Sequence, residues 1–383
     1  MIKIKKIDQF EDIGRKTWSD VMSSSKVNYI FQTYEYVSTW WKYFGQNQKN
    51  RELLLLVVED SGSIAAIAPL MITRPKFINK AVIQFVGTDI CDYMDFIIEH
   101  KNYENCFFKI IEYLSRLSFL EIDLKYVPEG SKTIQNFDND NGKNRIYQKI
   151  CQVDACPYIN LKKGWQEILK CLKSKLKAEI FRNERKLQEK GYLVFKSHTE
   201  KIPPEKLLKD YFDMHIKKWK YYSKSYSQFQ YKHWREFITS LSSLMFNSGW
   251  LDLSYLEFNN YMVACHFGFK YNDRLYYYMP TFDPAFATYS PAKILIMKMI
   301  EHLHNYGLKE FDFLRGKEPY KMAWTKISRP IYNVLYYSKI VPLRYSGFIY
   351  RALHDSYAKN VKPVLKKIKP LMRELYKSKG DIV

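Results

Sequence analysis

The chain has 383 residues, which is enough for two domains at roughly 100 to 200 residues each and excludes a peptide or a disulfide-stabilised mini-protein. Apolar residues make up 46% of it and charged residues 26%, so the composition predicts a folded globular protein and excludes a disordered one. The formal net charge of +21 favours anionic partners such as phosphates, coenzymes, nucleic acid or an anionic membrane face. A lysine-rich genome is the alternative explanation of this charge.

Targeting and metal signals are missing from the sequence. The six cysteines show no CxxC spacing, which favours a reducing compartment. The longest aliphatic run is Leu53–Val58, whereas a spanning helix needs about 20 apolar residues, and the start of the chain lacks the apolar core of a signal peptide. The eight histidines are dispersed. We therefore expect a cytoplasmic protein without a metal site.

The first part of the chain mixes strand and helix patterns. A helix capped by Thr33 is expected to end at Gly45, and a hairpin follows whose turn contains Gly62. The polar segment 128–144 has no apolar period and is expected to be a loop. The other predicted elements are the helix 31–44, the hairpin strands 53–59 and 64–72, the strands 81–86, 93–98 and 120–127, and the helix 104–117.

The second part begins with a basic amphipathic segment. Residues 162–190 carry a net charge of +6, and the segment 164–190 is predicted to be a helix, broken once, that ends at Gly191. Its basic face is either solvated or in contact with a polyanion. The pattern then predicts a helix opened by Pro203 and Pro204, a helix at 230–247, and a meander of the strands 251–258, 261–271 and 274–280 with two Asn-rich turns.

The best-marked helix starts after Ser290, the expected N-cap, and ends at Gly307. A buried strand at 311–314 and a last strand at 331–337 follow. The tail from Lys339 onward has a net charge of +8 and an apolar stripe, which suits a helix packed on the body, a membrane contact or an RNA contact; we favour packing.

Both parts run in the order hairpin, strand, helix, strand, which suggests two copies of one fold. The predicted fold class is α/β (α+β), with two similar domains that each contain a mixed, mostly antiparallel sheet flanked by helices. The predicted domains are residues 1–155 and 156–340, followed by a basic helical tail at 341–383.

Two segments contain the candidate site residues, since the GxSxG, GxxxxGK[ST] and GxGxxG motifs are absent. The start of the Ser290 helix presents free backbone N–H groups, including that of Ala292, and could bind an anion. Lys293 lies in the first turn of this helix, where a cation is unfavourable unless an anion lies nearby, so it suggests a bound anion. A solvated lysine is the alternative.

The second segment is FDFLRGKEPYKMAW, at residues 311–324. Asp312 lies between two phenylalanines on a buried strand, so it is either paired with Arg315 or Arg329 or is a site carboxylate. Glu318, Tyr320 and Lys321 follow the strand end, where side chains face a crevice in α/β sheets. A carboxylate can take a proton from an ammonium group, and a tyrosine can return one to a leaving group.

The strings YYYMPTFDPAFATYSPAKILIMKMIEHLHNYGLKEFDFLRGKEPYKMAW and FQTYEYVSTWWKYFG resemble the GNAT-type acyltransferases of the cellulose-biosynthesis CelD group, which are similar to FemAB/FemX peptidyltransferases. The likeness covers most of residues 30–338. It implies tandem GNAT domains, with the acyl donor between the strands 274–280 and 311–314 and the Ser290 helix facing the coenzyme pyrophosphate. Lys321 resembles the active-site lysine of the FemAB relatives.

The leading hypothesis is a GNAT-type N-acyltransferase that transfers an acyl group, expected to be acetyl from acetyl-CoA, to an amine on a sugar or a cell-envelope or polysaccharide precursor. The expected catalytic residues are Asp312, Glu318, Tyr320 and Lys321, the cofactor-binding residues are Tyr278, Ser290, Ala292 and Lys293, and the substrate-binding residues are Arg315 and Trp324.

One departure from the GNAT pattern leaves the donor open. The stretch 287–292 has no glycine, although GNAT enzymes meet the pyrophosphate with a glycine-containing loop. The donor is therefore either an acyl-CoA or, as in the FemAB relatives, an aminoacyl-tRNA that the basic segments would suit. A non-catalytic nucleic-acid or membrane binder is disfavoured, because most Tyr and Phe residues have core spacing. We expect no stable nucleic-acid complex, and a peripheral contact with the inner face of the membrane only through the basic tail.

Overall fold

The computed structural model describes residues 2–26, 28–74, 81–119, 121–135, 146–198, 205–223 and 226–338. The predicted basic tail and the residues Pro203 and Pro204 lie outside these ranges. Within them the strands form one mixed sheet of 13 strands in the order β1-β2-β3-β4-β6-β13-β7-β12-β11-β10-β9-β8, and β5 pairs with β3. The predicted fold class, a mixed sheet flanked by helices, is confirmed.

The N-terminal half contains most of the elements predicted from its sequence. The helix capped by Thr33 begins at Tyr34, and its last turn is a π-helix that ends at Gly45. The elements are β1 (Lys3–Ile7), η1 (Phe10–Asp12), α1 (Arg15–Ser24), η2 (Ile30–Gln32), α2 (Tyr34–Trp40), η3 (Trp41–Gly45), β2 (Arg51–Asp60), β3 (Ser63–Thr73), β4 (Val82–Phe85), β5 (Ile97–Ile98), η4 (His100–Asn102), α3 (Tyr103–Ser115), β6 (Glu121–Pro128) and η5 (Lys132–Ile134).

The C-terminal half begins with the long strand β7. The amphipathic segment 164–190 is broken once, as predicted, at Leu172 and Lys173. The elements are β7 (Ile146–Asn160), α4 (Trp165–Cys171), α5 (Ser174–Gln188), β8 (Leu193–Ser197), α6 (Glu205–Ser223), η6 (Gln228–Gln230), α7 (Lys232–Asn247), β9 (Leu251–Phe258), β10 (Tyr261–Tyr271), β11 (Arg274–Phe282), η7 (Pro284–Tyr289), α8 (Pro291–Asn305), β12 (Glu310–Asp312), α9 (Pro319–Met322) and β13 (Ser328–Ser338).

The turns of the predicted meander form for a local reason. Asn259, Asn260, Asn272 and Asp273 all have positive φ angles between 49° and 63°. Asn and Asp tolerate this conformation, which a two-residue hairpin turn between twisted strands requires. The antiparallel registers of β9, β10 and β11 follow directly from these turns.

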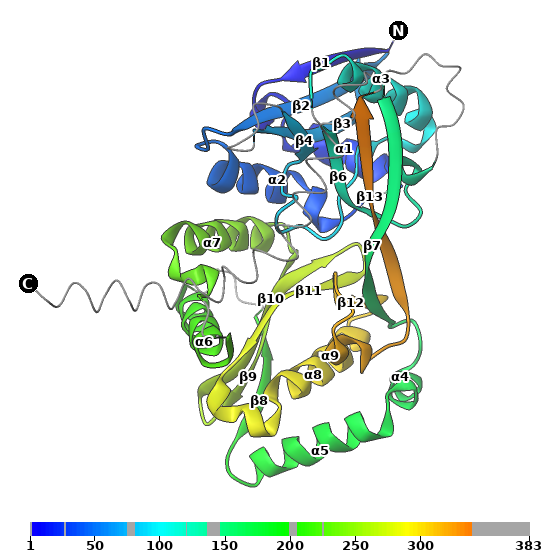
Figure 1. Cartoon of the computed structure of the whole chain (residues 1–383). Helices are drawn as coiled ribbons and strands as arrows, with labels where there is room; N and C mark the ends of the chain where they lie inside the picture. The colour runs from blue at the N-terminus through cyan, green and yellow to red at the C-terminus, as the bar shows by residue number, and fades with distance from the viewer. Residues whose placement is uncertain are drawn as a thin grey trace, which may run out of the picture.

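The strands β7 and β13 connect the two halves. They pair antiparallel along the whole of β13, while β13 also pairs with β6 and β7 also pairs with β12. In Figure 1 they run from the N-terminal half, at the top, into the C-terminal half below. The sheet is therefore continuous, and residue 155, where we place the boundary between the halves, lies inside β7.

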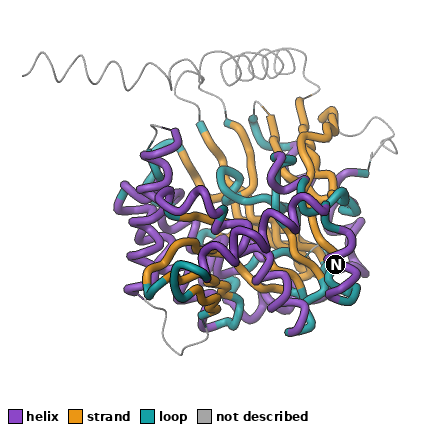
Figure 2. Tube along the Cα trace, turned by 90° about the horizontal axis from the view of Figure 1, so that it is seen from below, coloured by secondary structure: helices purple, strands orange, loops and turns teal. Residues whose placement is uncertain are grey.

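Helices cover both faces of the C-terminal part of the sheet. Helix α6 packs on β11 from one side, whereas α8 packs on β9, β10 and β11 from the other and is itself covered by α5 (Figure 1). Figure 2 shows the helices lying across the strands over most of the width of the molecule. The buried apolar residues form two clusters, one around α8 and one that joins the N-terminal core to α6 and α7.

Several elements differ from the sequence-based expectation. The strand expected at 93–98 is reduced to the two residues of β5, and β1, α1, β7, β8 and α9 were not predicted. The sequence of β7 alternates poorly, because this strand is paired on both sides and belongs to both halves.

Candidate active site

The parallel strands β11 and β12 pair for only three residues and then part. The pairs are Arg274 with Glu310, Leu275 with Phe311 and Tyr276 with Asp312. After β12 the chain follows β7 instead, because the N–H groups of Phe313 and Gly316 donate to carbonyl oxygens of that strand.

A cavity of about 360 Å³ lies where the strands part. It is lined by residues of α6, β11, the start of α8 and α9: Lys218, Tyr277, Pro280, Thr281, Phe282, Ala287, Ser290, Pro291, Ala292, Lys293, Ile296, Tyr320 and Trp324. We call it the acyl cavity. Its lining includes five of the predicted site residues, namely Ser290, Ala292, Lys293, Tyr320 and Trp324.

A bulge in β11 decides which tyrosine faces the acyl cavity. The register between β10 and β11 shifts at Gly268, and the N–H of Tyr278 donates to Nε2 of the buried His266 at 3.1 Å instead of continuing the ladder. The His266 ring also stacks on Tyr277 at 4.7 Å. Tyr277 lines the cavity, whereas Tyr278 points to the opposite face, where its hydroxyl bonds to Tyr36. The structure therefore does not place Tyr278, an expected cofactor ligand, in the acyl cavity.

The anion expected beside Lys293 is a side chain of the protein. Glu179 of α5 accepts hydrogen bonds from Lys293 Nζ at 2.6 Å and from the Ser290 hydroxyl at 3.1 Å. The bond from Lys293 lowers the pKa of the Glu179 carboxyl. Ser290 is the N-cap residue of α8, as expected, but it has a left-handed backbone with φ of 50° and its hydroxyl makes no capping bond. A carboxylate thus already lies at the start of α8.

Tyr320 and Glu318 provide a proton donor and a carboxylate beside the cavity. Burial, followed by the charge of Glu318, raises the pKa of Tyr320, so its hydroxyl stays protonated at neutral pH. Glu318 is half exposed and lies 3.0 Å from Lys321 Nζ. A Cβ on Gly316 would lie 2.5 Å from a Glu318 oxygen, so the loop brings this carboxylate close to its own backbone.

Two of the predicted cationic site residues hold the loop after β12. Lys321 is 5% exposed and donates to the carbonyl oxygen of Arg315 at 2.5 Å. Arg315 pairs with Asp92 of the N-terminal half at 3.2 Å and lies over the Tyr126 ring at 3.9 Å. Neither Lys321 nor Arg315 lines the acyl cavity, so their contacts hold the loop that carries Tyr320 and do not reach the cavity itself.

Asp312 is fully buried and also lies outside the cavity lining. Its carboxylate accepts hydrogen bonds from the Tyr93 hydroxyl at 2.7 Å and from Arg329 at 3.2 Å. Burial raises its pKa, while Arg329 and Arg274 lower it. Of the two expected partners, Arg329 is present and Arg315 is not, and this geometry favours the structural alternative for Asp312.

The sequence did not point to Lys218 and Thr281, although both line the acyl cavity. Lys218 comes from α6 and lies over the Phe282 ring at 4.9 Å. Burial lowers its pKa. The Thr281 hydroxyl is buried without a hydrogen-bond partner among the described residues. Thr281 lies one residue beyond the predicted strand 274–280 and belongs to β11 in the structure, so a longer strand prediction could have indicated it, whereas nothing in the sequence near α6 marks Lys218.

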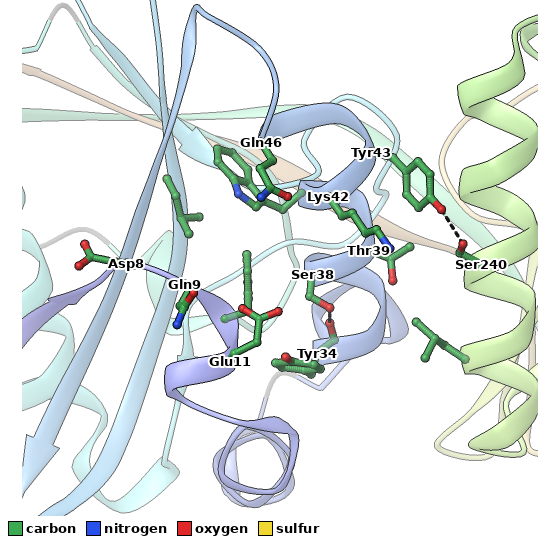
Figure 3. A pocket seen from close by; sticks show the side chains of 14 residues that line it. Asp8, Gln9, Glu11, Tyr34, Ser38, Thr39, Lys42, Tyr43, Gln46 and Ser240 are labelled. Atoms are coloured by element: carbon green, nitrogen blue, oxygen red, sulfur yellow. Dashed lines mark hydrogen bonds between the residues drawn. The ribbon is translucent and has the colours of Figure 1, made fainter.

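Two further cavities lie near the N-terminal half. The larger, of about 730 Å³, lies between the segment 8–11, helix α2 with its π turn, and α7, where Tyr43 and Ser240 are hydrogen-bonded at 2.7 Å (Figure 3). It shares no lining residue with the acyl cavity. The smaller, of about 300 Å³, is lined by Trp40, Phe44, Gln48, Asn50, Arg51, Asp89, Ile90 and Trp234.

Comparisons with known proteins agree with this geometry. Residues 174–322 match the family model described as the acetyltransferase (GNAT) domain. No curated protein sequence matches the chain significantly. This segment contains the strands that part, the α8 start and α9, so the protein is an acyltransferase with a GNAT domain.

Solved structures extend the likeness to the whole chain. FemX is similar with a TM-score of 0.61 and 10% identity, covering 89% of this chain and 98% of FemX. L-PGS from Bacillus licheniformis is similar with a TM-score of 0.53 and 10% identity, covering 91% of this chain and 98% of L-PGS. The C-terminal domain of a putative lysylphosphatidylglycerol synthetase from Agrobacterium fabrum is similar with a TM-score of 0.51 and 10% identity, covering 84% of this chain and 90% of that domain. At this identity the likeness shows the fold, and membership of the CelD group stays a prediction.

Metal and membrane features were searched in the described part of the chain. It contains no group of three or more His, Cys, Asp or Glu side chains that could hold a metal ion. None of its helices combines the length and the apolar character needed to cross a bilayer.

Proposed function

We propose that the protein transfers an acyl group from an activated carrier to an amine, and that the acyl group lies in the acyl cavity during transfer. The observation that carries this proposal is the parting of β11 and β12 beside the start of α8, which leaves a hollow lined by Tyr277 and Tyr320. Alignment of the amine with the acyl carbon can contribute roughly 7 to 11 kcal/mol toward the barrier without a covalent enzyme intermediate.

The proton transfers fall to the groups beside the cavity. The amine nitrogen attacks the acyl carbon, Glu318 takes the ammonium proton, and Tyr320 gives its proton to the departing thiolate or alkoxide. The raised pKa of Tyr320 means that its hydroxyl carries a proton at neutral pH, which disfavours its use as a base, although it also makes the phenol a weaker acid than a free tyrosine. Lys321 and Arg315 keep Glu318 and Tyr320 in place by fixing their loop to the N-terminal half.

The first candidate donor is an acyl-CoA, with acetyl-CoA expected from the GNAT domain. Its pyrophosphate would have to approach the start of α8, where Glu179 already accepts two hydrogen bonds and no glycine allows close approach. Lys293 and Ser290 already donate to the Glu179 carboxylate, and the negative charge of Glu179 repels a diphosphate. The start of α8 is therefore a poor diphosphate site.

The second candidate donor is an aminoacyl-tRNA, which this observation favours. An ester-linked aminoacyl group needs no diphosphate at the α8 start, and α4 and α5 add basic side chains on the outside of the molecule. The similar structures include FemX and the C-terminal domain of a putative lysylphosphatidylglycerol synthetase, whose name indicates the synthesis of a lysyl-bearing lipid.

For the acceptor we propose an amine on a sugar or cell-envelope precursor, bound in the smaller of the two further cavities. Trp234 contributes a partly exposed ring there, and Arg51, which lies over the buried Trp40 ring at 5.1 Å, pairs with Asp89 at 2.7 Å and offers polar groups with it. The Tyr278 hydroxyl donates to the Ile90 carbonyl at the edge of this cavity, on the face of β11 opposite to Tyr277.

The test compares the two carriers directly. Thermal unfolding is followed with acetyl-CoA, other acyl-CoA thioesters and a mixture of aminoacyl-tRNAs, since a ligand of the native state raises the melting temperature. The tRNA candidate predicts retention on a filter that falls steeply with salt. Tight acyl-CoA binding without RNA retention selects the first candidate. The proposed function is wrong if neither carrier binds the protein and neither carrier transfers its acyl group to any amine in a panel.

A further inference from the structure

The two lysines that line the acyl cavity have different surroundings. Lys293 is paired with Glu179 at 2.6 Å. Lys218 has no carboxylate within ion-pair distance among the residues that the structure describes. Its hydrogen-bonding contact is the carbonyl oxygen of Pro280, at the long distance of 3.5 Å. A half-buried ammonium group with so little compensation is costly unless a ligand supplies the missing charge.

Thr281 provides a second and independent sign of a missing ligand. It is 1% exposed, lines the same cavity, and its hydroxyl oxygen has no hydrogen-bond partner among the described residues. A buried hydroxyl without a partner costs roughly 1 to 3 kcal/mol. Thr281 directly follows Pro280, whose carbonyl oxygen Lys218 approaches, so both polar groups lie at the same end of β11.

The described groups next to Lys218 do not neutralise this end of the cavity. The adjacent Asp283 is bound by Lys217 at 2.7 Å and by the Tyr261 hydroxyl at 2.6 Å. His215, one turn before Lys218 on α6, is buried and hydrogen-bonded to Ser227, and burial followed by the charge of Lys218 lowers its pKa to about 3. Among the residues that the structure describes, Lys218 therefore has no counter-charge at this end of the cavity.

We propose that Lys218 and Thr281 form a subsite for an anionic oxygen group of the acyl donor, either a carboxylate at the end of the acyl chain or a phosphate of the carrier. In this subsite Lys218 pairs with the anion and the Thr281 hydroxyl donates to one of its oxygens. The inference rests on the proposed function, because it assigns the cavity to the donor. It assigns the donor anion to β11 and α6 and not to the start of α8, where Glu179 lies.

Three small probes separate the two sources of the anion. S-succinyl-N-acetylcysteamine has an acyl carboxylate and no phosphate, and 4′-phosphopantetheine has a phosphate and no acyl group. S-butyryl-N-acetylcysteamine has a similar chain and neither anion. Their dissociation constants are measured by calorimetry on the full chain, together with that of the carrier identified above.

The wild type is expected to bind one anionic probe about ten-fold or more tightly than the butyryl probe. Lys218→Met should remove this preference, and Thr281→Val should weaken it about three- to ten-fold. Lys42→Met in the cavity of Figure 3 and Thr88→Val, another buried threonine whose hydroxyl has no partner among the described residues, are the matched controls and should leave the preference unchanged.

Tighter binding of the succinyl probe assigns the anion to the acyl chain, and tighter binding of phosphopantetheine assigns it to the carrier. Equal binding of all three probes, or a preference that survives in Lys218→Met, overturns the subsite and leaves the proposed function intact. If no probe binds but a whole donor does, an unchanged dissociation constant of that donor for Lys218→Met overturns the subsite. Failure of every probe and every carrier overturns both proposals.

Discussion

The sheet contains two places where parallel strands pair briefly and then part, one in each half. In the N-terminal half β4 and β6 pair at Val82 with Glu121 and at Ile83 with Ile122. In the C-terminal half β11 and β12 pair at three positions. In each pair the chain passes from the first strand to the second through a helix that packs on the sheet, α3 in the first half and α8 in the second.

The two openings are used differently. After β4 the chain folds back beside β6, where the N–H of Met94 donates to the carbonyl oxygen of Tyr126, and the rings of Phe85 and Phe96 lie 5.3 Å apart. After β11 the short η7 leads directly into α8 and leaves the acyl cavity. In both halves the topology creates a gap between two parallel strands. The chain segment that follows the first strand decides whether this gap is filled by core side chains or stays open as a cavity.

The largest expected effect comes from emptying the N-terminal gap. Phe96→Ala removes a ring that is 1% exposed and contacts Phe85 and Phe107, and should lower the free energy of unfolding by about 3 to 5 kcal/mol. Phe282→Ala at the acyl cavity removes a half-buried ring and should cost about 1 kcal/mol. Denaturant unfolding of both variants checks this. Equal losses would contradict the difference between the two gaps.

The next effect concerns chemistry in the C-terminal gap. Tyr320→Phe removes the proposed proton donor and should lower kcat about 100-fold, with little change in stability. Tyr306→Phe, a substitution of a tyrosine that is 70% exposed at the end of α8, is the control and should be neutral. The measurement is the turnover with the donor identified by the carrier test. A Tyr320→Phe variant with wild-type turnover removes Tyr320 from the mechanism.

A pH series distinguishes the buried titratable groups of the two halves. His215, beside the acyl cavity, has its pKa lowered from 6.5 to about 3, and Asp95, in the N-terminal gap, has its pKa raised from 3.8 to about 6, both chiefly by burial. As pH falls below 6.5 the unfolded chain protonates this histidine and the folded chain does not, so stability is lost. Folded Asp95 takes up a proton below pH 6, which adds stability.

His215→Gln should therefore recover about 2 kcal/mol of the loss between pH 7.5 and pH 5, and Asp95→Asn should deepen the loss by about 1 kcal/mol. Denaturant midpoints at the two pH values provide the measurement. Variants with the same pH dependence as the wild type would show that these groups are not held in the described states.

The smallest effect compares two buried threonine hydroxyls without partners among the described residues, one in each half. Thr88→Val and Thr281→Val should each raise the free energy of unfolding by up to about 1 kcal/mol, because each removes an unsatisfied polar atom. Only Thr281→Val should weaken donor binding. Thermal unfolding with and without donor measures both properties, and a binding loss in Thr88→Val would contradict the assignment of the cavity.

The sequence predicted those features that depend on neighbouring residues. The Thr33 cap, the break between α4 and α5, and the turns at Asn259 and Asn272 follow from local propensity, and all are present. The opening between the strands 274–280 and 311–314 was expected from the resemblance to GNAT-type acyltransferases and not from a local pattern, and β11 and β12 part there. The strands β1, β7 and β8 were missed, because their formation depends on partners distant in sequence.

Among the site residues too, those whose positions depend on local sequence were predicted, and those that depend on distant packing were not. Tyr320, Trp324 and Lys293 line the acyl cavity as expected, since strand ends and helix starts place them there. Tyr278, expected to bind the cofactor, does not line the acyl cavity, because beside the bulge bound by His266 it is Tyr277 that faces the cavity. The partner of Lys293 and the position of Lys218 come from α5 and α6, whose packing on the sheet no short pattern encodes.

The shared strands β7 and β13 limit how the molecule can be divided. A fragment that began at residue 156 would lose most of β7 and leave β13 with an unpaired edge on both sides, which invites association between chains. Arg315 would lose Asp92, and Asp312 would lose the Tyr93 hydroxyl, so the loop with Glu318 and Tyr320 would lack its anchor. The first half is therefore the scaffold that holds the site loop of the second half in place.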